Sequence, residues 1–161
     1  MPVEIRRARI GEARLIGNLF RDTVRAVNRR DYSQAQVEAW APEVVDPGHW
    51  VARIEKMYFI VALRAGELAG FAGLNGADDL DLMYVSKDHQ RRGVASALLD
   101  DIEREARSRG SHRLATEASL TARLFMERRG FKVVAEQQVP HNDQVFTNFV
   151  MEKRLGDEPP N

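Results

Sequence analysis

The chain has 161 residues, contains no cysteine, and balances 24 Lys and Arg residues against 24 Asp and Glu residues. A chain of this length forms one domain that can bury a core without disulfides, and zero net charge argues against a nucleic-acid partner. No apolar run approaches the ~20 residues of a membrane span, and the histidines show no metal-ligand spacing. The charged N-terminus lacks an apolar signal core. We therefore expect a cytoplasmic protein that binds small molecules, without a metal.

The first half of the chain alternates strand and helix patterns. Apolar residues at a spacing of two indicate strands, and apolar residues at a spacing of three and four indicate helices. Ser33 stands where a helix cap is expected, and Pro42 and Pro47 interrupt the chain before the next helix. The expected elements are strands over residues 3–8, 57–64 and 68–74, and helices over residues 13–27, 34–40 and 48–56.

The second half continues the alternation after a turn at Asn75-Gly76. A strand over residues 79–85 leads through a polar loop into a helix that begins near Val94, with apolar residues every four positions. The other expected elements are strands over residues 113–117, 131–139 and 145–155, a helix that Ser119 caps and that runs to Arg129, and a disordered polar tail over residues 156–161.

The most informative segment is the loop before the helix at Val94, because it combines a glycine with two arginines. Residues 90–95 read Gln-Arg-Arg-Gly-Val-Ala. Free N–H groups and the dipole at a helix N-terminus make an anion site, and Gly93 allows the backbone to approach the anion closely. Neither a nucleotide-triphosphatase loop nor a dinucleotide-binding Gly-x-Gly-x-x-Gly motif is present. The pattern therefore indicates a site for a different pyrophosphate.

This loop resembles the Gln/Arg-x-x-Gly-x-Gly/Ala motif with which the GNAT superfamily of N-acetyltransferases holds the pyrophosphate of acetyl-coenzyme A. Residues 122–131, Ala-Arg-Leu-Phe-Met-Glu-Arg-Arg-Gly-Phe, are similar to the second GNAT signature and follow at the family's usual separation. The resemblance implies a single domain over residues 1–155. It also implies an α/β fold with a mixed, mostly antiparallel central sheet of about seven strands, flanked by helices.

The same resemblance implies a set of residues that bind acetyl-coenzyme A. Backbone groups of Met83 and Val85 would pair with the pantetheine arm, Ser119 would contact it, and Phe125 would pack against it. A purely structural role is the alternative for each of these four residues. The full set expected to bind the coenzyme is Met83, Tyr84, Val85, Gln90, Arg91, Arg92, Gly93, Val94, Ala95, Ser96, Ser119 and Phe125.

Three carboxylates are candidates for the base that deprotonates the acceptor ammonium. Asp79 and Asp81 alternate with Met83 and are expected to share its face, and Glu117 ends the neighbouring strand. Burial would raise the pKa of such a carboxylate and suit it to accept a proton directly or through water. The alternative is that Asp79 belongs to a turn and Asp81 faces solvent.

The chain departs from the family where a tyrosine usually protonates the leaving thiolate, because Met126 occupies that position. A thioether cannot donate a proton. Tyr84 could replace it only if a bulge reorients the strand, and Tyr58 and Tyr32 are further candidates. Otherwise water protonates the thiolate, or the thiolate leaves unprotonated.

The segment between the first two strands is expected to form the acceptor pocket, with Tyr32 and Trp40 in its wall. Aromatic and polar groups together suit a small polar or aromatic amine. The sequence therefore predicts acetyl transfer from acetyl-coenzyme A to the primary amine of a small molecule, by direct attack in a ternary complex. The alternatives are an acyl-coenzyme A-binding module with little turnover and an enzyme that acetylates a protein or peptide amine. A homodimer is one assembly left open.

Overall fold

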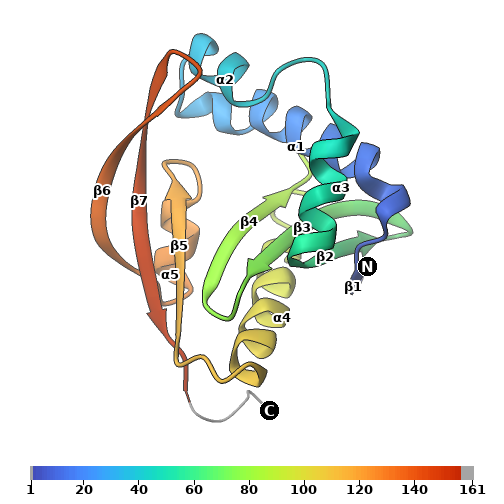
Figure 1. Cartoon of the computed structure of the whole chain (residues 1–161), viewed down its shortest axis with the longest axis vertical. Helices are drawn as coiled ribbons and strands as arrows, with labels where there is room; N and C mark the ends of the chain where they lie inside the picture. The colour runs from blue at the N-terminus through green and yellow to red at the C-terminus, as the bar shows by residue number, and fades with distance from the viewer. Residues whose placement is uncertain (1, 157–161) are drawn as a thin grey trace.

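The computed structural model describes residues 2–156, which form a mixed α/β domain (Figure 1). The strands are β1 (Val3–Arg7), β2 (Tyr58–Arg64), β3 (Glu67–Asn75), β4 (Asp79–Val85), β5 (Arg113–Ser119), β6 (Lys132–His141) and β7 (Gln144–Arg154). The helices are η1 (Ile10–Glu12), α1 (Ala13–Ala26), η2 (Asn28–Arg30), α2 (Gln34–Trp40), α3 (Pro47–Lys56), α4 (Val94–Ser108) and α5 (Arg123–Arg128).

One sheet connects all seven strands, in the order β1-β2-β3-β4-β5-β7-β6. Every neighbouring pair is antiparallel except β4 and β5, which are parallel. The β4–β5 pairing is also the shortest, since it joins only Asp79 to Ala115 and Leu80 to Thr116. The fold class expected from the sequence, with about seven mostly antiparallel strands flanked by helices, is confirmed.

Helices cover both faces of the sheet (Figure 1). On one face, α1 and α3 bury a cluster that includes Ile16, Trp50 and Phe71. On the other face, α4 and α5 bury a larger cluster around Leu98 and Met126. Burial of these apolar side chains from both sides is the main stabilising contribution, at roughly 25 cal/mol for each Å² removed from water.

A β-bulge interrupts β4 at Asp81. Leu74 is paired with Leu80 and Gly73 with Leu82, so Asp81 has no partner on β3. As a result, Leu80 packs on the α4 side while Leu82 packs on the α1 and α3 side. Met83 returns to the α4 side. Asp79 precedes Leu80 and faces away from it, so the prediction that Asp79 shares the face of Met83 is wrong, because the extra residue shifts the alternation between the two.

The segment around Ser119 also differs from the prediction. Ser119 ends β5, where it pairs with Asn148, and α5 begins only at Arg123. The Ser119 hydroxyl accepts a 3.1 Å hydrogen bond from the Ala122 amide, so it caps the turn before the helix rather than the helix itself. Strand pairing with β7 keeps Ser119 extended and displaces the start of the helix. The predicted disorder of the tail covers residues 156–161, of which residues 157–161 lie outside the described residues.

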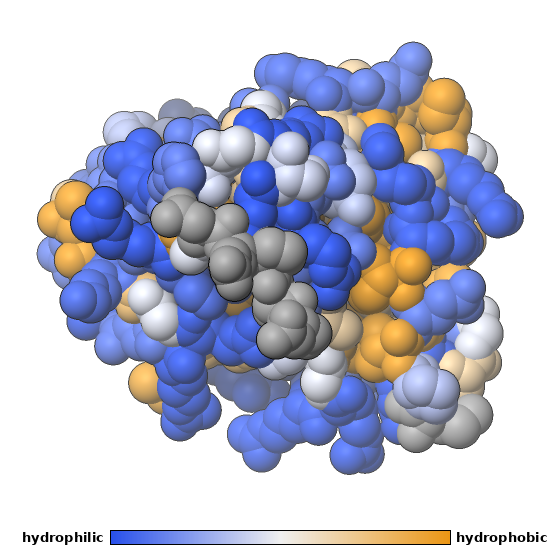
Figure 2. Space-filling view, turned by 90° about the horizontal axis from the view of Figure 1, so that it is seen from below, coloured by the Kyte–Doolittle hydropathy of each residue, from blue (hydrophilic) through white to orange (hydrophobic). Residues whose placement is uncertain are grey.

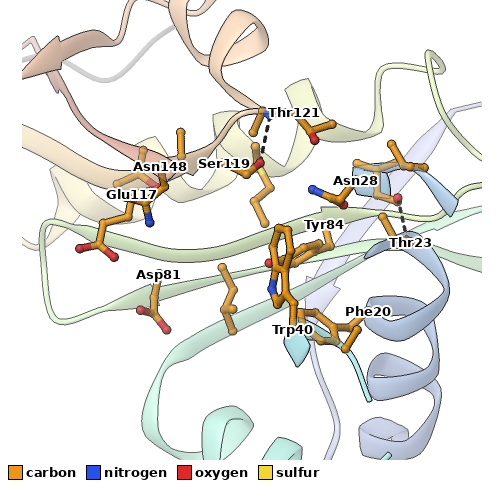
Figure 3. Close-up of a pocket in the computed structure, with 18 of the residues that line it drawn as sticks. Phe20, Thr23, Asn28, Trp40, Asp81, Tyr84, Glu117, Ser119, Thr121 and Asn148 are labelled. Carbon is orange, nitrogen blue, oxygen red and sulfur yellow. Dashed lines mark hydrogen bonds between the residues drawn. The ribbon is translucent and has the colours of Figure 1, made fainter. Parts of the chain in front are cut away.

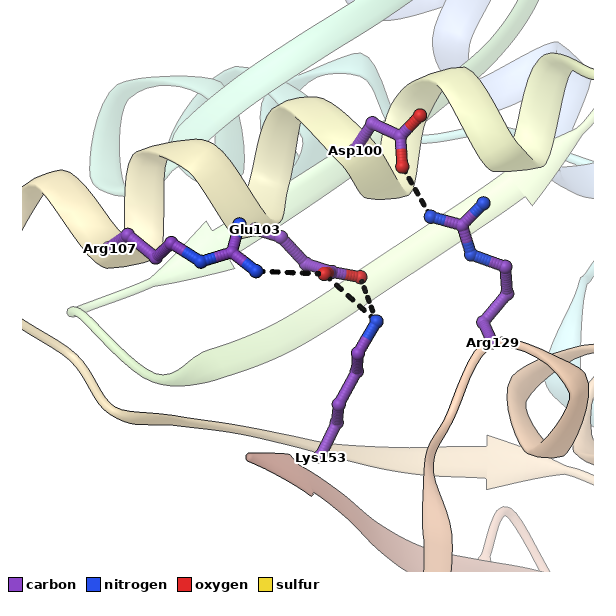
Figure 4. A network of polar contacts seen from close by, with 5 residues as sticks. All are labelled: Asp100, Glu103, Arg107, Arg129 and Lys153. Carbon is purple, nitrogen blue, oxygen red and sulfur yellow. Dashed lines mark hydrogen bonds and ion pairs between the residues drawn. The ribbon is translucent and has the colours of Figure 1, made fainter. Parts of the chain in front are cut away.

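An ion-pair cluster ties α4 to the C-terminal part of the sheet (Figure 4). Lys153 on β7 donates to both carboxylate oxygens of Glu103, at 2.9 and 3.0 Å, and Arg107 lies 3.7 Å from the same carboxylate. Arg129 pairs with Asp100 one turn earlier on α4. Glu103 is only 5% exposed, so its charge depends on these partners.

The face in Figure 2 is largely hydrophilic, with hydrophobic residues gathered in small separate groups. No helix in the described part of the chain is long and apolar enough to cross a membrane.

Candidate active site

A cavity of about 1290 Å³ opens where β4 and β5 part. The two strands are paired only at their first residues, and the rest of each strand forms one wall of the cavity. The loop before α4 and the start of α5 line one end, and residues of α1, α2 and α3 line the other. Figure 3 shows Asp81 and Glu117 on facing strands, with Tyr84 and Trp40 further along the cavity.

The backbone of β4 offers unpaired groups along this gap. The Ser86 amide donates to the Ala69 carbonyl, and hydrogen-bonded pairs alternate along an antiparallel ladder, so Tyr84 is bonded to β3 in the same way. The backbone groups of Met83 and Val85 therefore point towards β5, which has diverged. The Val85 carbonyl accepts hydrogen bonds from Thr23, at 3.1 Å, and from Gln90. This leaves the Val85 amide and both Met83 groups available to a ligand.

The loop before α4 has the geometry of an anion site. Gly93 is the N-cap of α4 with φ of 79°, and no side chain caps the helix. The first amides of an α-helix have no partner within the helix, so the N–H groups of Val94, Ala95 and Ser96 are free to bind an anion. All three residues line the cavity, and a Cβ built on Gly93 would have nothing within 4 Å. This geometry fits the diphosphate that the sequence motif predicts.

The first three residues of the motif, Gln90, Arg91 and Arg92, differ from one another in their position relative to the cavity. Arg91 lines the cavity, whereas Arg92 is exposed and does not. The Gln90 side-chain amide donates to the Val85 carbonyl at 2.8 Å and to the Ser86 carbonyl at 3.3 Å. Gln90 therefore fixes the shape of the loop, and Arg91 is the arginine that can reach a bound anion.

The two predicted pantetheine contacts outside β4 belong to the opposite wall. Ser119 and Phe125 both line the cavity and are partly exposed within it. Met126 also borders the cavity, but it is 2% exposed and packs in the core beneath it. Its side chain contributes packing and no proton.

The three candidate bases all line the cavity. Asp79 is half-buried, and burial, followed by the nearby charge of Asp81, raises the pKa of its carboxyl group. Asp81 and Glu117 are exposed, and Gln137 donates to Glu117 at 3.3 Å. Water can therefore reach Asp81 and Glu117, while the raised pKa of Asp79 lets its carboxyl group hold a proton to higher pH than an ordinary aspartate.

Tyr84 lies in the middle of the cavity beside Trp40 (Figure 3). Its ring contacts Phe20 and Phe71 at centroid distances of 5.0 and 5.5 Å, on the side of β4 opposite Met83. Burial raises the pKa of the Tyr84 hydroxyl, and a hydrogen bond from Trp40 partly offsets this rise. At neutral pH the hydroxyl is protonated and can act as a donor.

Tyr32 lines the cavity, but both roles of its hydroxyl are taken within the protein. The hydroxyl donates to the Thr147 carbonyl at 2.8 Å and accepts from the Leu120 amide at 2.9 Å. Its ring packs against Trp40 at a centroid distance of 5.3 Å. Tyr32 therefore joins the α1–α2 connection to β7 and supports the wall to which Trp40 belongs.

The structure adds residues to the pocket that sequence reasoning did not assign. These include Phe20 on α1 and His49 and Arg53 on α3. Arg29 and Arg30 in η2 are exposed and do not line the cavity. The spacing of Trp50 and Arg53 on one helix was a usable signal, because residues three apart share a helix face.

Comparisons with known proteins agree with this geometry. Residues 28–154 match the family model described as acetyltransferase (GNAT) domain. The chain is 32% identical over 149 residues to YafP of Escherichia coli K12, which is named an uncharacterized N-acetyltransferase. The aligned residues cover 92% of this chain and 94% of YafP.

Solved structures show the same fold. A GCN5-related N-acetyltransferase from Rhodopseudomonas palustris superposes with a TM-score of 0.92 at 30% identity, covering 96% of this chain and 97% of that chain. The PaiA N-acetyltransferase from Thermoplasma acidophilum, in complex with coenzyme A, superposes with a TM-score of 0.78 at 20% identity. This superposition covers 96% of this chain and 99% of the PaiA chain. The chain is therefore a member of the GNAT family of N-acetyltransferases.

Proposed function

We propose that the enzyme transfers an acetyl group from acetyl-coenzyme A to the primary amine of a small molecule, by direct attack in a ternary complex. The observation that carries this proposal is one cavity with the geometry of an anion site at one end and the candidate bases Asp79, Asp81 and Glu117 along its walls. PaiA has the same fold, is 20% identical to this chain and was solved in complex with coenzyme A, which supports coenzyme A as the ligand of this cavity.

The coenzyme end of the cavity provides binding and orientation. The amides of residues 94–96 and the Arg91 side chain would hold the diphosphate. The pantetheine amides would pair with the free backbone groups of Met83 and Val85, as an added strand does. A free amide on β4 near the thioester would also stabilise the negative charge that develops on the carbonyl oxygen during attack.

The carboxylates would prepare the acceptor. A primary ammonium must lose a proton before its nitrogen can attack the thioester carbon. Asp81 and Glu117, which are exposed to water, would accept this proton through a water molecule. Asp79, with its raised pKa, would share the proton, and the nearby negative charges would attract the ammonium.

Tyr84 would take over the proton-donating role that Met126 cannot perform. When nitrogen bonds to the carbonyl carbon, the carbon–sulfur bond breaks and a thiolate leaves. The protonated Tyr84 hydroxyl lies in the same cavity and can return a proton to the sulfur, directly or through water. Such general acid help is worth roughly 10²–10⁴-fold in rate.

Acetyl-coenzyme A binding by calorimetry, with thiol release measured across a panel of amines, tests this proposal. Binding together with thiol release on at least one small amine is the expected result. Binding without turnover on any amine would favour a binding module, and turnover only on peptides would favour a protein acceptor. Failure to bind would show that the chain shares only the fold of the family.

A further inference from the structure

Arg53 is a cation in the acceptor half of the cavity with unused hydrogen-bond donors. Its guanidinium lies over the Trp50 ring, 4.8 Å from the ring centroid, and it lines the cavity. Among the described residues it has no hydrogen bond and no ion pair within 4.0 Å. Stacking on an aromatic ring uses only the flat face of the guanidinium, so the N–H donors around its edge are left for another group.

The other cations near Arg53 do not offer the same capacity. Arg21 donates to Asp22 at 3.0 Å and to the Glu43 carbonyl at 3.1 Å, so a carboxylate already pairs with its charge. Burial, with the positive charge of Arg53 beside it, lowers the pKa of His49, which is therefore neutral at pH 7. Arg53 is the cation at this end of the cavity that can pair with an anion.

The residues around Arg53 limit the kind of ligand that can carry this anion. Burial lowers the pKa of Arg53, and the negative charge of Asp81 opposes this shift, which places Asp81 in the same part of the cavity as Arg53. Phe20, Trp40 and Tyr84 form a partly exposed aromatic wall there (Figure 3). A ligand in this space meets a carboxylate, a guanidinium and aromatic rings together.

We propose that the acceptor is an amine that also carries a carboxylate, in particular an amino acid with an aromatic side chain, and that Arg53 binds its carboxylate. This inference rests on the proposed function. The planar carboxylate matches the donor edge of the guanidinium, which can bind it with two parallel hydrogen bonds. The ammonium then lies towards Asp81 and Glu117, and the aromatic side chain packs on the wall formed by Phe20, Trp40 and Tyr84.

The experiment compares amino acids with the amines that lack only the carboxylate. The probes are L-tryptophan with tryptamine, and L-phenylalanine with phenethylamine. Thiol release from acetyl-coenzyme A gives kcat/KM for each member. The wild-type enzyme should favour the amino acid in each pair by roughly 10- to 100-fold, the range expected for hydrogen bonds to a charged group.

Variants of α3 assign this preference to one side chain. Arg53→Gln should abolish the preference by lowering kcat/KM for the amino acids while leaving the matched amines nearly unchanged. Arg53→Lys keeps the charge without the planar donor edge and should restore part of the preference. Lys56→Gln is the control, because it removes the same charge from the last turn of the same helix at an exposed position outside the cavity.

The outcomes separate this inference from the proposed function. Equal turnover of amino acids and amines, or an equal loss for both in Arg53→Gln, would overturn the carboxylate assignment and leave the acetyltransferase proposal standing. Thiol release with neither member of either pair would overturn the substrate class, whatever other amines the enzyme accepts. Acetyl-coenzyme A affinity, measured by calorimetry, should be the same in all four proteins, and a loss in Arg53→Gln would also overturn the assignment.

Discussion

Thr116 on β5 donates a buried 2.8 Å hydrogen bond to the carbonyl of Leu80 on β4, at the last paired position before the two strands diverge. This side-chain hydrogen bond takes the place of the next backbone hydrogen bond between β4 and β5, and the cavity begins beyond it. The Thr116 hydroxyl therefore sets the point at which the sheet opens.

Thr116→Val should destabilise the protein by about 1–3 kcal/mol, because the substitution leaves the buried Leu80 carbonyl without a donor. Urea unfolding measures this change. Thr121→Val is the matched control, since the Thr121 hydroxyl bonds an exposed Asp31 and its loss should cost less than about 0.5 kcal/mol. Equal effects of the two substitutions would contradict the role given to Thr116.

The anion site can be tested with two variants of nearly identical shape. Gly93 has φ of 79°, a conformation that Asn and Asp adopt more readily than other side chains. Gly93→Asp should abolish coenzyme A binding because it places a carboxylate at the diphosphate site, whereas Gly93→Asn should retain most of it. Calorimetry with coenzyme A measures both. Similar affinities would show that no anion binds at the start of α4.

The neighbouring arginines provide a second matched pair. Arg91 lines the cavity and Arg92 does not. Arg91→Ala should weaken coenzyme A binding by roughly tenfold or more through loss of a charge-assisted contact, and it should not change the binding of pantetheine, which lacks phosphate. Arg92→Ala should have little effect on either ligand. A larger effect at Arg92, or equal losses for both ligands, would contradict this assignment.

The pKa of Asp79 leads to a prediction about stability and pH. Burial, together with the charge of Asp81, raises the pKa of this carboxyl group in the folded state. The folded protein then binds the proton more tightly than the unfolded chain, so Asp79 stabilises the fold at low pH and this contribution is lost as pH rises through the raised pKa.

Asp79→Asn should therefore be more stable than the wild type at pH 7. The advantage should shrink below the ordinary aspartate pKa of about 3.9, where the wild-type carboxyl is protonated in both states. Thermal unfolding between pH 3 and pH 8 measures the difference. A substitution that destabilises the protein equally at both ends of this range would show that Asp79 is a structural residue with favourable contacts.

In the ion-pair cluster on α4, Glu103 should contribute much more to the free energy of unfolding than Asp100. Glu103→Gln removes the charge between Lys153 and Arg107 and should cost about 3–5 kcal/mol, as expected when one partner of a buried pair is lost. Asp100→Asn breaks an exposed pair with Arg129 and should cost less than about 1 kcal/mol. Urea unfolding of both variants checks the ratio, and equal losses would show that burial of Glu103 does not matter.

Local sequence predicted the parts of the molecule whose chemistry is local. The glycine and polar residues before Val94 specify a turn and a helix start, and the apolar spacing along α4 specifies its buried face. The strand-loop-helix unit that forms the proposed anion site could therefore be predicted from the sequence. The anion-site residues that contribute backbone amides were the easiest to place, because a helix start alone positions them.

The bulge at Asp81 could not be predicted, because neither glycine nor proline marks it and its cause is the pairing of β4 with β3. The inward hydrogen bonds of Gln90 depend on the carbonyls of Val85 and Ser86, which the loop brings to its side chain. Arg53 joins the cavity only because α3 packs beside α1, far from the motif in sequence. Residues that act through tertiary neighbours were the ones that sequence patterns missed.

The free edge of β4 also affects the mechanics of the enzyme. Strands β1–β4 and β5–β7 form two half-sheets that share only two paired positions. A ligand that bonds to the backbone of Met83 and Val85 spans the gap between these halves and restores a continuous ladder. In the proposed complex, coenzyme exchange would require the half-sheets to move relative to each other, and the rate of product release would depend on how readily the protein flexes along this line.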